Sequence, residues 1–506
     1  MLKEAMCYDK GMEKNIEGMK VVTASEMARV EKVSIESGAS DEGYMLKAGE
    51  GIACFIEQFI QDEDLEKVVT LVVGKGNNGG DAFVAGTFLL HRGFQVEAYH
   101  PFEMEGCSPL CQKQGKEFIS SGGTLQEAMH LKGVVVDGLF GTGFQGEVEG
   151  VSKEIIQRIN DSNRPVISID IPSGVNGNTG EAPFAIKADW TLYLGMAKLG
   201  FFTRDGYKFV GKLHPIDFGM ERQFENMATV EGHLIHEAAI ATLLPKVERD
   251  RHKYQAGYVI ALAGSKGMPG AAMLSCLAAL RTGAGIVRLF HPEGMEKELV
   301  NSPYELIKTP YQWGDDHQIQ GEAKRAKGCL IGPGIGKEEE MHQFVQRVVS
   351  KLKVPMVIDA DALYHIKTFP KGAVLTPHHK EACHLLGRDT IDFKACQAFA
   401  DREEVTLVVK GAPTWIFHPK VSPLVIAKGD PGMATAGTGD VLTGMIAALL
   451  AQGLEGRKAA ALGVTMHAMS GEIAAQKRTS YDMIASDLIN ELPEVFQTLL
   501  SQLPQE

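Results

Sequence analysis

The stretch Val68-Val69-Thr70-Leu71-Val72-Val73, followed by Gly74-Lys75-Gly76-Asn77-Asn78-Gly79-Gly80-Asp81, indicates the fold class of this chain. The nearly uninterrupted apolar run predicts a strand buried on both faces, as strands of parallel sheets are. The glycine-rich segment predicts a tight turn into a helix over 82–92. Backbone N–H groups exposed at a helix start suit an anion such as phosphate. A turn without a ligand is the alternative, and the two Asn and one Asp favour a ligand site.

Similar patterns recur along both halves of the chain. We expect strands over 68–73, 95–99, 134–137, 166–169 and 190–194, then over 258–263, 285–290, 329–331, 356–358 and 406–409. Amphipathic or apolar helices are expected over 26–37, 45–61 and 445–450. Alternating strands and helices predict α/β domains with parallel sheets covered on both faces. A polar, charge-mixed segment follows Met220, so we place a domain boundary between about 222 and 250.

Polar clusters follow two more strands of the first half. One is Asp137-Gly138-Leu139-Phe140-Gly141-Thr142-Gly143, and the other is Asp170-Ile171-Pro172-Ser173-Gly174. Each cluster alone is more often an ordinary loop. Because the carboxyl ends of parallel strands meet at one edge of a sheet, we expect the clusters to converge on a ligand site. Oxygens from Asn78, Asp137 and Ser173 also form a candidate site for a hard cation such as K+.

The strongest local signal of the second half is Gly437-Thr438-Gly439-Asp440, directly before an apolar helix. Glycines at the helix start would leave N–H groups free to stabilise developing negative charge. Asp440 is placed to act as a base toward a hydroxyl that attacks a phosphoryl group. It could equally be a residue that caps the helix, and the sequence leaves both interpretations open.

Further loops are expected at strand ends of the second half. They are Gly264 to Gly270, Gly332-Pro333-Gly334-Ile335-Gly336, Thr376-Pro377-His378-His379 and Lys410-Gly411-Ala412-Pro413-Thr414. Adjacent side chains point in different directions, so at most one of His378 and His379 should face a site. We treat the other histidines, His467 among them, as structural.

Composition narrows the classes of function. Glycine accounts for 56 of 506 residues, about 11% against a usual ~7%. The formal net charge of −13 argues against nucleic acid or an anionic membrane as partner. Eight cysteines in so long a chain predict reduced thiols and a cytoplasmic protein. The sequence contains no long uncharged apolar stretch, and 1–18 is expected to be a tail without a secretory signal.

These motifs, in this order, resemble one family over about residues 19–499. This family comprises the bifunctional NAD(P)H-hydrate repair enzymes, in which an NAD(P)HX epimerase is fused to an NAD(P)HX dehydratase. The resemblance implies a tail over 1–18, a Rossmann-like three-layer epimerase domain over 19–222 and a ribokinase-like α/β dehydratase domain over 223–506. It departs from the usual pattern at Ala82, where the family has another glycine after Asn-Asn-Gly-Gly-Asp.

The resemblance also implies roles for individual residues. In the epimerase half, Asp170 would be catalytic and K+ would bind Asn78, Asp137 and Ser173. The hydrated dinucleotide would contact Asn77, Asn78, Gly79, Gly80, Asp81, Gly141, Thr142, Gly143, Phe144, Gln145, Gly146, Glu147 and Asp170. In the dehydratase half, Asp440 would be catalytic and would contact the hydrated nucleotide together with Ala271, Gly334 and His378. The adenine nucleotide would contact Lys410, Gly411, Ala412, Pro413, Thr414 and Gly439.

The implied activity is metabolite repair. The epimerase interconverts the R and S forms of hydrated NADH and NADPH, and the dehydratase restores NAD(P)H at the expense of ADP or ATP, with Mg2+ on the nucleotide. We expect a homo-oligomer whose partners are small molecules. A ribokinase-like vitamin or sugar kinase with a ligand-sensing Rossmann-like domain is the alternative enzyme, and a Rossmann-like partner-binding module is the alternative without catalysis.

Overall fold

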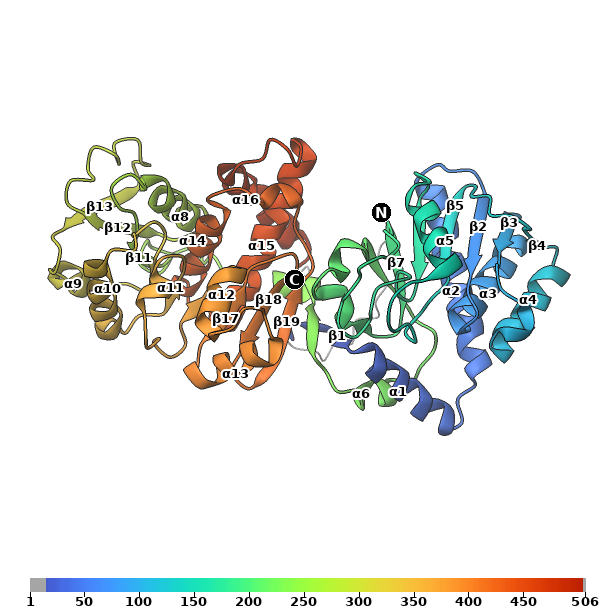
Figure 1. The fold of residues 1–506 in the computed structure, drawn as a ribbon. Coiled ribbons are helices and arrows are strands. Elements are labelled where there is room, and N and C mark those ends of the chain that lie inside the picture. Colours follow the sequence, from blue (N-terminus) through green and yellow to red (C-terminus); the bar gives the residue numbers. More distant parts are fainter. Residues whose placement is uncertain (1–14, 504–506) are drawn as a thin grey trace. The chain divides into compact units, whose positions relative to one another are not determined.

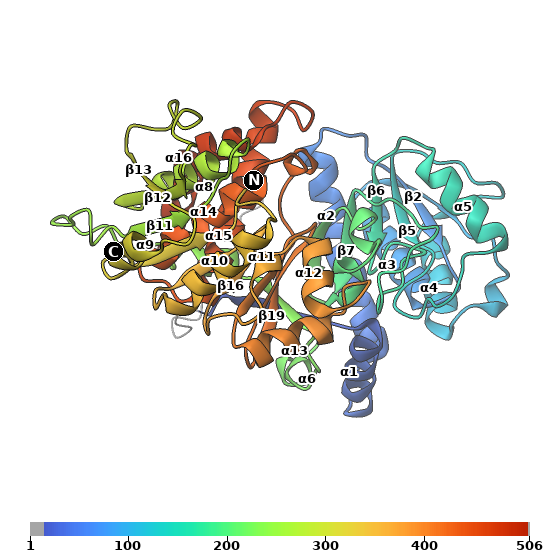
Figure 2. The same ribbon diagram turned by 60° about the vertical axis from the view of Figure 1, so that its left-hand side comes forward.

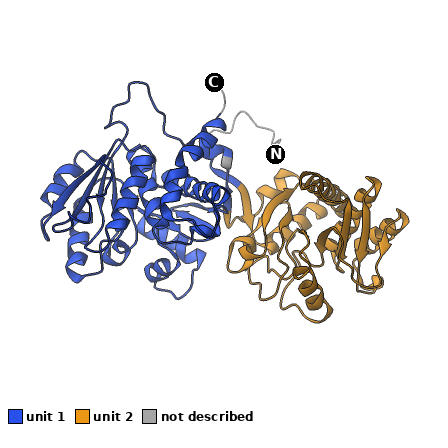
Figure 3. Ribbon diagram, turned by 90° about the horizontal axis from the view of Figure 1, so that it is seen from above, with its two compact units in different colours: residues 1–18, 233–506 blue, residues 19–232 orange. Residues whose placement is uncertain are grey.

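The computed structural model describes residues 15–503, so most of the tail expected over 1–18 lies outside the described residues. The described chain forms two compact units (Figure 3). Unit 2 comprises residues 19–232, and unit 1 comprises residues 15–18 together with 233–503. The division at Gly232 and His233 falls within the polar segment where the sequence changes character. No helix of residues 15–503 has both the length and the apolar character needed to cross a bilayer.

Unit 2 is built on a parallel sheet of strand order β4-β3-β2-β5-β6-β7-β9 (Figure 1). Its strands are β2 (Val68–Val73), β3 (Gln95–Tyr99), β4 (Thr124–Leu125), β5 (Val134–Gly138), β6 (Val166–Ile169), β7 (Trp190–Leu194) and β9 (Lys212–Ile216). Outside this seven-stranded sheet, β1 (Glu17–Val22) pairs in parallel with β8 (Ala197–Lys198) through Val21 and Val22. The α-helices are α1 (Ala24–Glu36), α2 (Asp41–Asp62), α3 (Asn77–His91), α4 (Pro109–Ser120), α5 (Gly150–Asn160) and α6 (Arg222–Asn226).

Alternate residues of β2 point to opposite faces of this sheet and enter different hydrophobic cores. Val69, Leu71 and Val73 pack with apolar residues of α2, α3 and α4. Val72 packs on the other face with residues of α5. The sheet is therefore buried on both sides, as the apolar run of the sequence predicts, and the three-layer fold is confirmed.

One boundary differs from the sequence prediction. The helix expected over 82–92 begins at Asn77, so the Asn-Asn-Gly-Gly-Asp segment forms its first turns instead of a loop before it. Gly79 shows why this is possible, because a Cβ atom there would lie 2.4 Å from the carbonyl oxygen of Gly74. Glycine thus lets the helix start directly beneath the end of β2, with its first N–H groups at the sheet edge.

Unit 1 has the strand order β13-β12-β11-β14-β15-β16-β17-β18-β19-β10. The strands are β10 (Gly232–Ile235), β11 (Tyr258–Leu262), β12 (Ile286–Pro292), β13 (Leu306–Tyr311), β14 (Gly328–Ile331), β15 (Met356–Ile358), β16 (Val374–Leu375), β17 (Thr406–Val409), β18 (Thr414–His418) and β19 (Val421–Ile426). The helices are α7 (Glu237–Ala241), α8 (Pro269–Arg281), α9 (His317–Ala323), α10 (Glu339–Lys351), α11 (Ala362–His365), α12 (His379–Leu386), α13 (Phe393–Glu403), α14 (Thr438–Ala451), α15 (Gly456–Lys477) and α16 (Ala485–Ser501).

The core of unit 1 lies between one face of its sheet and the helices α8, α14, α15 and α16. The helices α9 to α13 lie on the other side of the strands (Figure 2). Strands β17, β18 and β19 are antiparallel, unlike the parallel sheet expected from the sequence. Only Pro419 and Lys420 separate β18 from β19, and Lys420 has a φ of 63°. Pro423 inside β19 breaks the apolar run from which that strand would be predicted.

The contact between α8 and α14 yields a stability prediction. A Cβ atom at Gly444 would lie 2.0 Å from the carbonyl oxygen of Ser275 on α8. We expect Gly444→Ala to destabilise unit 1 by about 1–3 kcal/mol, because the two helices would have to separate. Gly321→Ala in α9 is the matched control, since nothing lies within 4 Å of its Cβ position, and it should stabilise by up to about 1 kcal/mol. Thermal unfolding measures both, and equal midpoints would contradict the prediction.

Candidate functional sites

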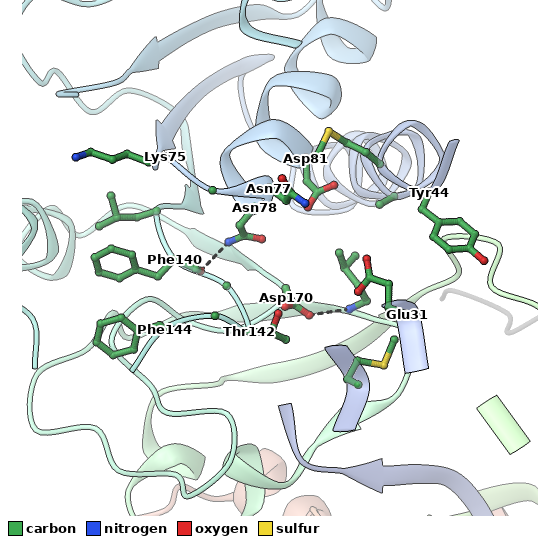
Figure 4. A pocket seen from close by; sticks show the side chains of 18 of the residues that line it. Glu31, Tyr44, Lys75, Asn77, Asn78, Asp81, Phe140, Thr142, Phe144 and Asp170 are labelled. Carbon is green, nitrogen blue, oxygen red and sulfur yellow. Dashed lines mark hydrogen bonds between the residues drawn. The ribbon is translucent and has the colours of Figure 1, made fainter. Parts of the chain in front are cut away.

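Unit 2 contains a cavity of about 760 Å³, which we call the first site (Figure 4). Of the residues predicted to bind the hydrated dinucleotide, those that line it are Asn77, Asn78, Asp81, Gly141, Thr142, Gly143, Phe144, Gln145 and Asp170. The predicted residues Gly79, Gly80, Gly146 and Glu147 are not part of this lining. The three glycine- and Asp-containing clusters do therefore converge at one edge of the sheet.

The N-terminus of α3 forms one wall of the first site. Gly76 precedes the helix in an extended conformation, and its carbonyl accepts from the N–H of Gly79, while Gly76, Asn77 and Asn78 all line the cavity. The hydroxyl of Ser108 donates to Oδ1 of Asn77 at 2.8 Å. Ala82, the position at which the sequence departs from the pattern it resembles, is fully buried. A Cβ at Gly138 would lie 2.7 Å from the methyl of Ala82, so the missing side chain of Gly138 makes room for that methyl.

A buried ion pair lies at the inner end of the cavity. Lys198 Nζ is 2.5 Å from Oδ1 of Asp170, and the Lys198 side chain is 0% exposed. The same ammonium donates to the carbonyl of Leu194 at 2.8 Å. Asp170 has a φ of 64°, a left-handed conformation that aspartate rarely adopts and that directs its carboxylate out of the strand end.

Two more carboxyl groups face this pair. Burial, followed by the charge of Asp170, raises the pKa of Glu31 to about 7. The same two causes raise the pKa of Asp81 well above its usual range. Figure 4 shows the carboxylate of Glu31 directed toward the Asp170 ion pair. The first site thus holds carboxyl groups that can carry a proton at neutral pH, beside one that is ion-paired.

The three predicted K+ ligands have distinct surroundings. The buried carboxylate of Asp137 accepts hydrogen bonds from the hydroxyls of Ser168 at 2.8 Å and Ser173 at 2.6 Å, and from the N–H of Ser173 at 2.9 Å. The amide of Asn78 donates to the carbonyls of Phe140 and Ile169. Its buried Oδ1 has no hydrogen-bond partner within the described part of the chain. An orphaned amide oxygen suits a hard cation, so the residues fit K+.

Unit 1 holds a second set of predicted residues at its strand ends, which we call the second site. Gly437, with a φ of 95°, precedes α14 and places Asp440 in its first turn. Burial, followed by the nearby Asp359 and opposed by Lys410, raises the pKa of Asp440 to about 7. The position where a Cβ of Gly439 would stand is 3.2 Å from Lys410 Nζ. The predicted nucleotide lysine and the predicted base therefore meet at one helix start.

The remaining predicted residues of the second site lie at the start of α8 and in three loops. Gly334, with a φ of 64°, packs against Ala271, because a Cβ there would lie 3.0 Å from the Ala271 methyl. His378 caps α12 and accepts from the N–H of Glu381, while half of its side chain remains exposed. In the loop 410–414, the hydroxyl of Thr414 donates to the carbonyl of Gly411 at 3.0 Å.

Sequence reasoning missed several residues of both sites. Glu31 comes from α1 and Lys198 from β8, and neither follows a strand of the main sheet. Asp359 directly follows β15, so the strand-end rule that found Asp170 could have found it. His467, treated as structural, bonds through Nε2 to the carbonyl of Thr438 at 2.9 Å. Burial lowers its pKa to about 4, so its neutral ring supports the first turn of α14.

The raised pKa of Glu31 predicts how stability depends on pH. Because the folded protein binds this proton more tightly than the unfolded chain, Glu31 costs stability as the pH rises from about 4.5 to about 7. Glu31→Gln should therefore be more stable than the wild type above pH 7 and equally stable below pH 4.5. Thermal unfolding at a series of pH values measures the difference. A constant difference across that range would contradict the prediction.

Comparisons with known proteins cover both units. Residues 42–200 match a family model described as YjeF-related protein N-terminus, and residues 259–494 match one described as NAD(P)H-hydrate dehydratase. The bifunctional NAD(P)H-hydrate repair enzyme Nnr of Moorella thermoacetica is 33% identical, covering 95% of this chain and 97% of its own. The enzyme of the same name from Coxiella burnetii is 32% identical, covering 92% of this chain and 97% of its own.

A solved structure is similar to about half of the chain. It is the ADP/ATP-dependent NAD(P)H-hydrate dehydratase of Bacillus subtilis co-crystallised with ATP and Mg2+, with 27% identity, 52% of this chain and 97% of that chain covered, and a TM-score of 0.46. The match to the bifunctional relatives runs through both units in order and over nearly their full length. The chain therefore belongs to the bifunctional NAD(P)H-hydrate repair enzyme family.

Proposed function

We propose that unit 2 epimerises hydrated NADH and NADPH at the first site and that unit 1 dehydrates the S form at the second site, using ADP or ATP. The observation that carries this proposal is a carboxyl group with a pKa of about 7 at each site: Glu31 of α1 lines the cavity beside the Asp170 ion pair, and Asp440 lies in the first turn of α14 near Lys410. Each lies among the family's binding motifs. Proton transfer at neutral pH needs such a group.

At the first site, the hydrated nicotinamide ring would lie beside Asp170. Inversion at C6 breaks the bond between that carbon and its hydroxyl oxygen, which needs a proton on the departing oxygen, and then remakes the bond from the other face of the ring. Glu31 carries a proton about half the time near pH 7 and could supply it, taking one back from the returning water. The carboxylate of Asp170, held by Lys198, would stabilise the positive charge left on the ring.

The K+ ion would be held by Asn78, Asp137 and Ser173, behind the N-terminus of α3. When bound, it supplies positive charge to balance the buried carboxylate of Asp137. The phosphates of the dinucleotide would accept hydrogen bonds from the N–H groups of the first turn of α3. An acidic protein can bind an anionic dinucleotide in this way, because backbone donors do the holding.

At the second site, Asp440 would take the proton of the C6 hydroxyl while that oxygen attacks the terminal phosphoryl group of ADP. The bond to the leaving AMP breaks, and the N–H groups at the start of α14 stabilise the charge on the transferring group. Phosphate then leaves C6 with the electron pair of the C–O bond. Loss of a proton from C5 restores the ring double bond and gives NAD(P)H. With ATP the leaving nucleotide is ADP, and Mg2+ would accompany the nucleotide phosphates.

A kinase at the second site would instead release a stable phosphorylated product. The dehydratase releases free phosphate and a nicotinamide that absorbs in the near ultraviolet. Product analysis with hydrated NADH and ADP therefore distinguishes the two functions.

The two active-site aspartates should separate the two activities. In a mixture of both hydrate epimers with ADP, the wild type should convert all of the material to NADH. Asp440→Asn should lower dehydration by about 10²–10⁴-fold, as expected on loss of a general base, and leave epimer exchange intact. Asp170→Asn is the reciprocal control, which should stop conversion when the S form is consumed. Loss of both activities in Asp440→Asn would contradict the assignment of the two sites.

Binding of K+ should stabilise unit 2 without any substrate. We expect the thermal midpoint to rise when KCl replaces choline chloride at equal ionic strength, because the cation binds only the folded site. Asn78→Leu should abolish this dependence, since it removes the orphaned amide oxygen. Asn226→Leu is the control for an exposed asparagine of the same unit. A midpoint insensitive to K+ in the wild type would contradict the proposed ion site.

A further inference from the structure

We infer that Asp359 is the positioning residue of the second site, holding the Lys410 ammonium against the first turn of α14. This inference rests on the proposed dehydratase function. Asp359 directly follows β15 and is 1% exposed. Its Oδ1 accepts from Lys410 Nζ at 2.7 Å, and its Oδ2 accepts from the hydroxyl of Thr443 at 2.5 Å. One buried carboxylate therefore ties the end of β17 to the second turn of α14.

The backbone of Asp359 joins a third loop to this arrangement. Its N–H donates to the carbonyl of Ile331 at 3.0 Å. A Cβ at Gly332 would lie 1.8 Å from the carbonyl oxygen of Asp359, so only glycine permits that approach. The loop 332–336, which contains the predicted substrate residue Gly334, therefore packs directly against the backbone of Asp359.

Lys410 connects a fourth loop. Its N–H donates to the carbonyl of Pro377 at 2.9 Å, and it forms a parallel bridge with His378. The Lys410 and Asp359 side chains therefore stand where the predicted substrate loops and the predicted nucleotide loop meet. A buried ion pair is a poor source of stability, because desolvation offsets most of its attraction. We infer that the Lys410–Asp359 pair instead serves to fix the Lys410 ammonium beside the start of α14, where the nucleotide phosphates would bind.

Asp359 also influences the proposed base. Its charge raises the pKa of Asp440, as does that of Asp361, while Lys410 lowers it. The other titratable groups around these residues are His378, which caps α12, Glu381 of α12, and His467 of α15, whose ring bonds the first turn of α14. Without Asp359, the Lys410 ammonium would be free to pair with Asp440, which would weaken the base and withdraw the cation from the nucleotide.

A double-mutant cycle tests this role. Asp359→Asn should lower the kcat of dehydration about tenfold or more, and it should move the acid limb of the pH profile down by about one unit. If Asp359 acts through Lys410, the double variant Asp359→Asn/Lys410→Ala should be no slower than Lys410→Ala alone, within about threefold. Multiplicative losses, or an unmoved acid limb, would overturn the inference.

Asp361→Asn is the matched control. This carboxylate also raises the pKa of Asp440, yet its hydrogen bond goes to the N–H of Gly336 at 3.1 Å. Asp361→Asn should shift the acid limb of the pH profile. The loss of kcat in the double variant Asp361→Asn/Lys410→Ala should equal the product of the losses in the two single variants. Thr443→Val removes the other hydrogen bond to Asp359 and keeps the ion pair with Lys410. It should leave the acid limb of the pH profile in place. This variant tests whether the loss of one contact to the Asp359 carboxylate is enough to unfold unit 1. Epimerase activity of each variant monitors the integrity of unit 2.

Nucleotide affinity separates this inference from the proposed function. If the wild type regenerates no NADH, the proposed function fails, and the same cycle is then measured as ADP affinity by titration calorimetry. Non-additive losses in Asp359→Asn and Lys410→Ala would support the positioning role even then. Additive losses would refute it.

Discussion

A buried lysine–aspartate ion pair stands at the carboxyl edge of the sheet in each unit. Lys198 pairs with Asp170 at 2.5 Å in unit 2, and Lys410 pairs with Asp359 at 2.7 Å in unit 1. Each aspartate directly follows a parallel strand, where ligands of α/β folds bind. Because transferring both charges from water is costly, such a pair persists only where the surrounding backbone fixes it. The positive φ of Asp170 and the close approach of Gly332 to Asp359 are two signs of that constraint.

The pairs shape the electrostatics of their neighbours. Each contains a carboxylate whose charge disfavours ionisation of a second carboxyl group nearby, so burial and repulsion together raise the pKa of Glu31 and of Asp440. The lysine partly opposes this effect and keeps the shift moderate. Each site therefore contains a carboxyl group that titrates near pH 7, the range in which a histidine usually titrates. In the proposed function, the glycine-rich helix starts supply N–H groups for the anionic ligands, so the acidic chain does not depend on a basic surface to bind them.

The sequence predicted the parts of this arrangement that depend on local pattern. Apolar runs predicted β2, β5 and β6, and the polar clusters after them contributed residues that line the cavity. It missed Glu31 and Lys198, because these residues reach the cavity only through packing of α1 and β8 in three dimensions. It placed the start of α3 too late, since glycines that usually end helices here permit close packing on Gly74. The pairing of β18 with β19 was hidden by a proline within the strand.

Glu31 and Asp440, the two carboxyl groups whose pKa is about 7, need opposite protonation states. In the proposed chemistry, Glu31 supplies a proton and is active in its protonated form, whereas Asp440 removes one and is active when ionised. The fraction of protonated Glu31 falls as the pH rises through about 7, and the fraction of ionised Asp440 rises over the same range. Repair of both epimers needs the two steps in series, because the second site takes only the S form. In the proposed function, the epimerisation step therefore weakens and the dehydration step strengthens as the pH rises through about 7, so the two steps have opposite pH dependence.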